Sequence, residues 1–163
     1  MKRILFSLLF IISFESVFST HIIGGEMRYE YIGPGIVSPN SKQYRVRLLL
    51  LRGTTGAGFI AQYVVGVFNN DNGQKVLGPA TNNNWAAVED FSAPLPVPEI
   101  VSPCIQPPPP SFGYTYKTYS FLIELPDNNN GYTVAFQTFS RQNSNNIFVN
   151  QGATYSCVIP GLS

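Results

Sequence analysis

Alternating apolar and polar positions are most regular between Tyr114 and Phe139. Every second residue is apolar on either side of a polar turn: Tyr119, Phe121, Ile123 and Leu125 before it, and Tyr132, Val134 and Phe136 after it. A period of two is typical of a half-buried strand. The turn, Pro126 to Gly131, ends in Asn-Gly, which accepts the positive φ of a tight reversal. This stretch therefore predicts a β-hairpin, and we expect it to be the central pair of the sheet.

Similar patterns predict strands before and after this hairpin. They cover Glu26 to Tyr31, Gln43 to Arg52, Gln62 to Phe68, Gln74 to Leu77, Val97 to Val101, Ile147 to Val149 and Thr154 to Ile159. Leu48 to Leu51 is a continuous apolar run, which indicates burial on both faces of its strand. Asp71-Asn72-Gly73 predicts a hairpin turn. No stretch predicts a helix.

The stretch from Gly78 to Phe112 breaks the alternation with asparagine and proline, including the run Pro107 to Pro110. Proline lacks a backbone donor and has a fixed φ, so we expect a stiff, extended crossover between two sheets. Short strands, frequent turn signals and the absence of a helical pattern predict an all-β fold. We expect an antiparallel two-sheet sandwich of the immunoglobulin-like class, formed by residues 20–163 as a single domain.

Residues 1–19 have the three parts of a secretory signal peptide. Lys2-Arg3 precedes an apolar run, Ile4 to Phe14, and a small residue follows at Ser19, after which we predict cleavage. The alternative is a membrane anchor, but this run is much shorter than the roughly 20 residues of a spanning helix. No later stretch is long enough to cross a bilayer as a helix. We therefore expect a protein exported across the inner membrane, either secreted or at the cell surface.

The charge of the predicted mature chain is balanced. The full chain has 10 basic and 9 acidic residues, and cleavage would remove Lys2, Arg3 and Glu15, which leaves a formal charge of zero. Nucleic-acid binding requires a clustered basic surface, so this balance argues against that class of function.

Cys104 and Cys157 are the two cysteines of the chain. An even number in an exported protein makes them candidates for a disulfide. The alternative is two free thiols, because the sequence does not fix the distance between their Cα atoms.

Candidate catalytic residues are few. His21 is the single histidine, and a hydrolytic triad needs a positioned histidine or an equivalent base. A metal set of His21 and Glu26 falls short of the four ligands of a structural zinc site. Glu26 and Glu30 lie about 13 Å apart along one strand face, beyond the range of paired glycosidase carboxylates. We therefore predict no enzymatic activity, no cofactor and no metal site.

Turns and aromatic side chains are the better candidates for binding. Asparagine clusters in several turns, where with Asp71 and Asp127 it offers oxygen ligands for calcium. The alternative, which we favour, is that asparagine serves the turns themselves, since it tolerates left-handed backbone. Trp85, Tyr114 and Tyr116 are candidates for stacking on sugar rings.

The predicted mature chain begins Thr20-His21-Ile22-Ile23-Gly24-Gly25-Glu26-Met27-Arg28-Tyr29, and Gln43-Tyr44-Arg45-Val46 and Gly131 to Gln137 follow in order. These blocks resemble the N-terminal domain of large Bacteroidetes cell-surface proteins, which begins with "THIVGGE". The resemblance implies PKD or Ig-like modules downstream and often a gliding-motility-associated C-terminal sorting domain. That family continues beyond the position of Ser163, so we expect a lone or truncated N-terminal domain.

These features predict an exported, non-enzymatic structural or adhesive module at a bacterial cell surface, with other surface proteins or glycans as partners. The alternative is a carbohydrate-binding module that uses Trp85, Tyr114 or Tyr116 together with Asp/Asn loops. An extracellular hydrolase built on His21 and Glu26 is a third hypothesis.

Overall fold

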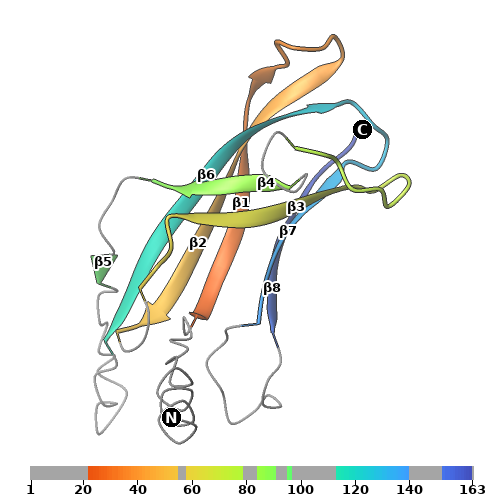
Figure 1. Cartoon of the computed structure of the whole chain (residues 1–163). Coiled ribbons are helices and arrows are strands. Elements are labelled where there is room, and N and C mark those ends of the chain that lie inside the picture. The colour runs from red at the N-terminus through yellow and green to blue at the C-terminus, as the bar shows by residue number, and fades with distance from the viewer. Residues whose placement is uncertain are drawn as a thin grey trace, which may run out of the picture.

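Eight strands are found in the computed structural model, which describes residues 22–54, 58–78, 84–90, 95–96, 113–139 and 152–162 (Figure 1). They are β1 (Ile22–Pro34), β2 (Ser41–Gly53), β3 (Gln62–Asn69), β4 (Trp85–Glu89), β5 (Leu95–Pro96), β6 (Tyr114–Pro126), β7 (Tyr132–Thr138) and β8 (Ala153–Ile159). The predicted all-β class is thus confirmed. Among these residues there is no helix with the length and hydrophobicity of a membrane-spanning segment.

The strands form one antiparallel sheet that is nearly closed into a barrel. Its order is β1-β2-β6-β4-β3-β7-β8, and β5 pairs with β6 beside this path. The sheet curls until its two outer strands approach each other: a Cβ on Gly25 of β1 would lie 3.2 Å from Cε1 of Tyr155 on β8. The prediction of an immunoglobulin-like two-sheet sandwich is therefore wrong.

Strand β3 is the physical reason for this difference. Its first half, 62–65, pairs with β4, whereas its second half, 66–69, pairs with β7. One strand thereby continues the hydrogen-bond ladder between groups of strands that a sandwich would keep apart. The alternation pattern along β3 is the same in both architectures, so the sequence pattern did not distinguish them.

The predicted central hairpin is correct in its strands but wrong in its pairing. Both β6 and β7 form, and Gly131 between them has a φ of 73°, as expected for Asn-Gly. However, β6 pairs along its whole length with β2, while β7 pairs with β3 and β8. In the sheet order, β4 and β3 lie between β6 and β7. The turn is therefore a corner that carries the chain across the barrel.

Some of the other predicted strands are confirmed and others are not. The strands expected near β1, β2, β3 and β8 are confirmed, and β1 begins four residues earlier and ends three residues later than expected. The strand expected at Gln74 to Leu77 is reduced to an isolated bridge between Phe68 and Lys75. Strand β4 was missed inside the expected crossover, although it joins β6 to β3. The predicted strands Val97 to Val101 and Ile147 to Val149 lie outside the described residues.

The apolar core fills the inside of the curved sheet. Its buried members are Ile22, Met27, Tyr44, Val46, Leu48, Leu50, Tyr63, Val65, Val67, Ala87, Tyr119, Ile123, Leu125, Tyr132, Val134, Phe136 and Ile159. The Tyr63 ring packs edge-to-face on two others, with its centroid 4.7 Å from Tyr119 and 5.1 Å from Phe136. Burying one large apolar side chain contributes about 1.5–3 kcal/mol, so these rings are major contributors to stability.

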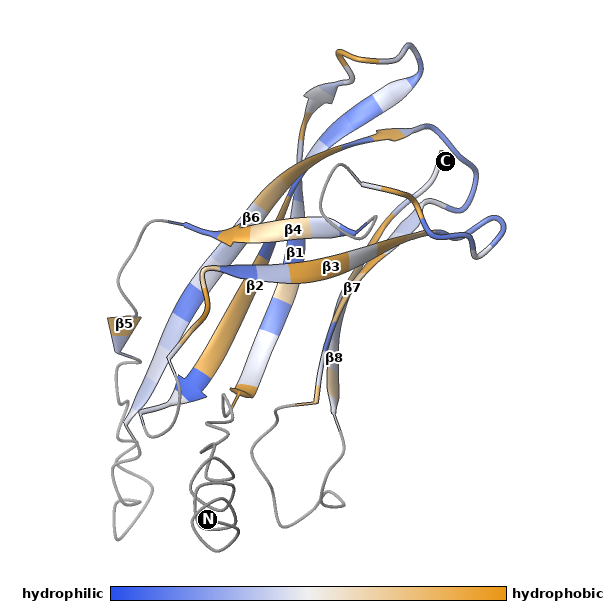
Figure 2. Ribbon diagram, viewed as in Figure 1, coloured by the Kyte–Doolittle hydropathy of each residue, from blue (hydrophilic) through white to orange (hydrophobic). Residues whose placement is uncertain are grey.

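Strand β2 shows how the sheet sorts its apolar residues. The later half of β2 is largely apolar (Figure 2). Leu48 and Leu50 are buried inside the barrel, whereas Leu49 and Leu51 are half-buried on the other face. Burial on both faces was predicted, and it is complete on the inner face only.

Candidate functional site

The β1–β2 hairpin projects beyond the other strands at one end of the barrel (Figure 1). Its two strands are paired up to Pro34 and Lys42, and the turn between them is the loop 35–40. Ile36 is 83% exposed and Val37 is 88% exposed. We call these two residues the apolar tip. Folded proteins usually bury side chains of this kind, so their full exposure marks the loop as a candidate contact surface.

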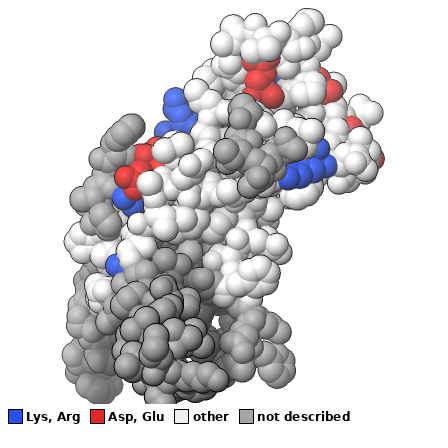
Figure 3. All heavy atoms as spheres, viewed as in Figure 1, with Lys and Arg blue, Asp and Glu red and all other residues white. Residues whose placement is uncertain are grey.

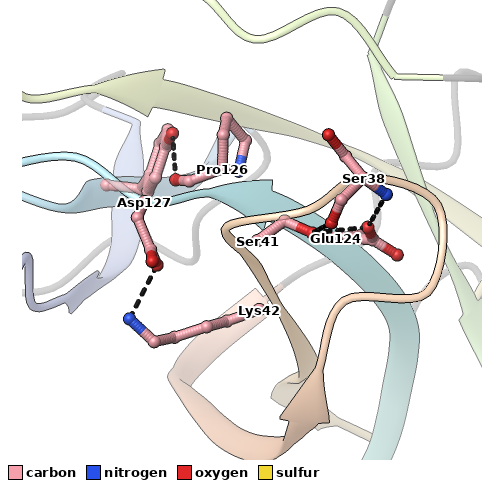
Figure 4. Close-up of polar contacts among 7 residues, drawn as sticks. Ser38, Ser41, Lys42, Glu124, Pro126 and Asp127 are labelled. Carbon is pink, nitrogen blue, oxygen red and sulfur yellow. Dashed lines mark hydrogen bonds and ion pairs between the residues drawn. The ribbon is translucent and has the colours of Figure 1, made fainter.

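A single carboxylate holds the backbone of this loop. Glu124 of β6 accepts hydrogen bonds from the N–H groups of Ile36 at 3.0 Å, Val37 at 3.0 Å and Ser38 at 2.9 Å. The Ser41 hydroxyl donates to Glu124 Oε1 at 2.6 Å (Figure 4). Successive backbone N–H groups that converge in this way form an anion-binding nest. Here the anion is a side chain of the protein itself.

The nest changes the acidity of Glu124. The hydroxyl hydrogen bond from Ser41, followed by the backbone bonds from Ser38, Ile36 and Val37, lowers the pKa of Glu124 to about 2. Donors that point at the ionised form favour it over the neutral form. Glu124 is therefore a carboxylate at every ordinary pH, and the loop keeps its anchor.

The start of this loop requires glycine at position 35 because there is no room for a Cβ atom, and not because of its φ angle. A Cβ on Gly35 would lie 1.7 Å from the Ser41 hydroxyl oxygen and 2.5 Å from Glu124 Oε1. Any other side chain would displace the hydrogen bond between these two groups. The sequence Pro-Gly therefore brings the backbone close to the carboxylate, and the next two side chains point outward.

A second set of contacts holds the hairpin next to its turn. Lys42 forms an ion pair with Asp127 at 2.7 Å (Figure 4), and the Asp127 N–H donates to the Asn40 carbonyl at 2.8 Å. The hydrogen bond to Asp127 raises the pKa of Lys42. The Tyr132 hydroxyl donates to the Pro126 carbonyl at 2.8 Å. The corner between β6 and β7 is thus tied to the start of β2.

The asparagine-rich segments 69–73 and 127–131, here called the asparagine turns, bind each other. The Asp71 carboxylate accepts the N–H groups of Asn129 at 3.2 Å and Asn130 at 3.1 Å, together with the Asn130 side-chain amide at 2.7 Å. The Asn70 N–H donates to the Gly131 carbonyl at 3.0 Å. The carboxylate oxygens of Asp71, which were candidate ligands for calcium, therefore accept hydrogen bonds from N–H groups of the protein. Among the described residues no group of three His, Cys, Asp or Glu side chains is placed to hold a metal ion.

The predicted stacking residues do not form one platform. Trp85 stacks on Phe121, with ring centroids 5.9 Å apart and planes at 22°, and is partly buried against the core. Its indole also lies against Gly78, where a Cβ would come within 2.7 Å. Tyr114 and Tyr116 are half-buried near the start of β6. Tyr116 is five residues from Phe121 on β6, or about 17 Å along the strand, which separates it from Trp85.

The remaining predicted residues divide between described and undescribed parts of the chain. Cys157 on β8 has a free, half-buried thiol, and burial raises its pKa to about 11. Its predicted disulfide partner, Cys104, lies outside the described residues. So do residues 1–19, which are the predicted signal peptide, and His21. Glu26 lies exposed on β1.

Charged side chains are interspersed on the face shown in Figure 3 rather than gathered by sign. Arg45 and Arg47 of β2 flank Glu30 of β1, with guanidinium-to-carboxylate distances of 3.5 Å and 3.4 Å. Exposed ion pairs of this kind contribute little to stability, typically about 0–1 kcal/mol.

Comparison of the chain with models of known protein families, with curated proteins and with solved structures found no match. The resemblance to Bacteroidetes surface proteins therefore stays a prediction.

Sequence reasoning missed the residues that make the projecting loop distinctive. Strands were predicted at Glu26 to Tyr31 and Gln43 to Arg52, but Ile36 and Val37 between them were not singled out. Two adjacent aliphatic residues enclosed by turn residues were the available signal. The role of Glu124 had no such signal, because its partners in the loop lie more than 80 residues away in the sequence.

Proposed function

We propose that the chain is an exported, non-enzymatic adhesive module of a bacterial cell surface, and that the apolar tip contacts another surface protein. The observation that carries this proposal is the combination of two nearly fully exposed aliphatic side chains with a backbone fixed by Glu124. The export of the chain rests on the signal peptide of residues 1–19. The expectation of a non-enzymatic role rests on the poor catalytic inventory of the sequence, with one histidine.

Energetics favour the apolar tip as a contact surface. Full burial of one aliphatic side chain contributes about 1.5–3 kcal/mol, and Ile36 and Val37 are available together. Ordering a mobile loop on binding would offset part of this gain. Because Glu124 already orders the backbone of 36–38, most of the gain is retained.

Cell attachment provides the test. The full chain is expressed in a Bacteroidetes host, and attachment is compared for the wild type and the double variant Ile36→Ser, Val37→Ser. Leu77→Ser is the matched control, because Leu77 is also a loop residue and is 66% exposed. We expect the tip variant to lose most attachment and the control to keep it.

Localisation is measured in the same cells. A mature protein that begins at Thr20 and lies outside the inner membrane supports the proposal. An uncleaved cytosolic protein would sink it, and so would a tip variant that attaches as well as the wild type.

A further inference from the structure

Strand β1 becomes exposed as it approaches its turn. Met27, Tyr29 and Tyr31 alternate along one face of β1, and their exposed fractions rise from 9% to 36% and then 53%. Met27 belongs to the core, so the two tyrosines lie on the continuation of the inner face. Their rings are therefore open to solvent on β1, which is an outer strand of the sheet.

A buried third ring holds these two in place. Tyr44 on β2 is paired in register with Tyr31 and is only 8% exposed. Its ring centroid lies 5.9 Å from Tyr29 and 5.8 Å from Tyr31, with interplanar angles of 77° and 61°. Residues two apart on a strand are about 6.8 Å apart. Tyr29 and Tyr31 thus offer neighbouring aromatic surfaces on a common support, and we call the three residues the tyrosine row.

Polar groups border the tyrosine row. Lys42 lies two residues before Tyr44 on β2, and its ion pair with Asp127 is at the surface. A small hollow beside them is lined by Lys42, Tyr44, Asp127 and Asn128, among others. The ion pair is electrically balanced and carries both donors and acceptors, so this border suits a neutral polar ligand.

We infer that the tyrosine row binds a neutral oligosaccharide. A sugar ring has apolar C–H faces and a rim of hydroxyl groups. Aromatic side chains pack against such faces, while a few placed polar groups hydrogen-bond the rim. Tyr29 and Tyr31 supply the first element, and Lys42 and Asp127 supply the second. This site is separate from the apolar tip and takes a different class of ligand.

Binding to immobilised neutral oligosaccharides of glucose, galactose, mannose and N-acetylglucosamine tests the inference with the purified mature chain. The double variant Tyr29→Ala, Tyr31→Ala should weaken binding by about tenfold or more, because two stacking rings are lost. Tyr31→Phe keeps the ring and should stay within about twofold of the wild type. Tyr116→Ala is the control at a sequence-predicted platform and should leave affinity unchanged.

Three results would overturn the inference: no saccharide bound by the wild type, equal binding by the double variant, or binding of a proline-rich peptide alone. Should the double variant melt early, Tyr31→Ala gives the same comparison, because more than half of that side chain is exposed. The Ile36→Ser, Val37→Ser protein should bind sugars normally. Failure of the saccharide site is therefore distinguishable from failure of the proposed protein contact.

Discussion

Two turns of this protein are each held by a carboxylate, and the two carboxylates have different structural effects. Glu124 binds three successive N–H groups of the loop at the end of β1 and leaves Ile36 and Val37 facing solvent. Asp71 binds N–H groups of a neighbouring turn and thereby joins two asparagine turns. The same local chemistry presents an apolar surface in one case and joins two turns in the other. What differs is where the carboxylate lies: Glu124 belongs to strand β6, whereas Asp71 belongs to the other turn.

The largest effect is expected at Gly131 in the asparagine turns. Gly131 has a φ of 73°, and a Cβ there would lie 1.9 Å from the Ile159 carbonyl oxygen. Left-handed backbone costs about 1–2 kcal/mol for a residue with a Cβ, and the clash adds to it, so Gly131→Ala should lower unfolding free energy by about 3 kcal/mol. Urea denaturation measures this loss.

Gly73 is the matched control for that experiment. Its φ of 69° is nearly the same, but a Cβ there would meet nothing within 4 Å. Gly73→Ala should therefore cost only the backbone term, about 1 kcal/mol. Equal losses for the two variants would show that the contact with the C-terminal segment does not matter.

A smaller loss is expected when the carboxylate between the asparagine turns is neutralised. Asp71→Asn keeps the shape and one carbonyl oxygen but removes the charge that strengthens its bonds to Asn129 and Asn130. We expect a loss of about 1 kcal/mol, because the site is exposed and solvent screens it. Cell attachment should not change. An attachment defect in Asp71→Asn would contradict this, because it would mean that the asparagine turns also take part in attachment.

Glu124→Gln should act locally rather than globally. The amide keeps a single carbonyl oxygen, so fewer N–H groups of 36–38 retain a partner. Hydrogen exchange of these amides should accelerate by about tenfold, while protection in β3 and β7 stays the same. Attachment should fall together with loop protection. Unchanged exchange at 36–38 would mean that Glu124 does not order the loop.

The pH dependence of loop order follows from the same carboxylate. The pKa of Glu124 is lowered from an ordinary value of 4.5 to about 2. A depressed pKa in the folded state gives a stabilisation that is complete above 4.5 and is lost as the pH falls towards 2. Amide protection at 36–38 should therefore persist at pH 5 and disappear near pH 2. Loss of protection at pH 5 would contradict the lowered pKa.

The smallest change in stability is expected for the apolar tip. Ile36→Ser and Val37→Ser alter side chains that pack against almost nothing, so each should change unfolding free energy by less than about 0.5 kcal/mol. Their effect should appear in attachment instead. A large loss of stability would mean that the tip packs within the protein rather than against a partner.

Local patterns predicted the strands better than their partners. Alternation located β6 and β7, and Asn-Gly correctly predicted positive φ at Gly131. Pairing is a long-range property, however, and a tight turn between two strands does not force them to pair. The barrel depends on β3 changing partners at mid-strand, and it also depends on β4, five residues within a stretch interpreted as a crossover.

The candidate sites were harder to predict for a related reason. Trp85 was predicted to be a stacking platform at the surface, yet it packs against Phe121 on another strand. Tyr29 and Tyr31 looked like ordinary inward-facing residues of a strand. Their exposure arises because β1 is an outer strand of the sheet, which alternation does not encode. Burial is set by the rest of the sheet.

The placement of the outer strands has a mechanical consequence. The beginning of β1 and the end of β8 lie at opposite ends of the barrel (Figure 1). Hydrogen bonds between antiparallel strands run perpendicular to the strand axes. Tension applied between Ile22 and Ile159 therefore pulls along β1 and β8 and shears their ladders with β2 and β7 as whole units, instead of opening them one bond at a time.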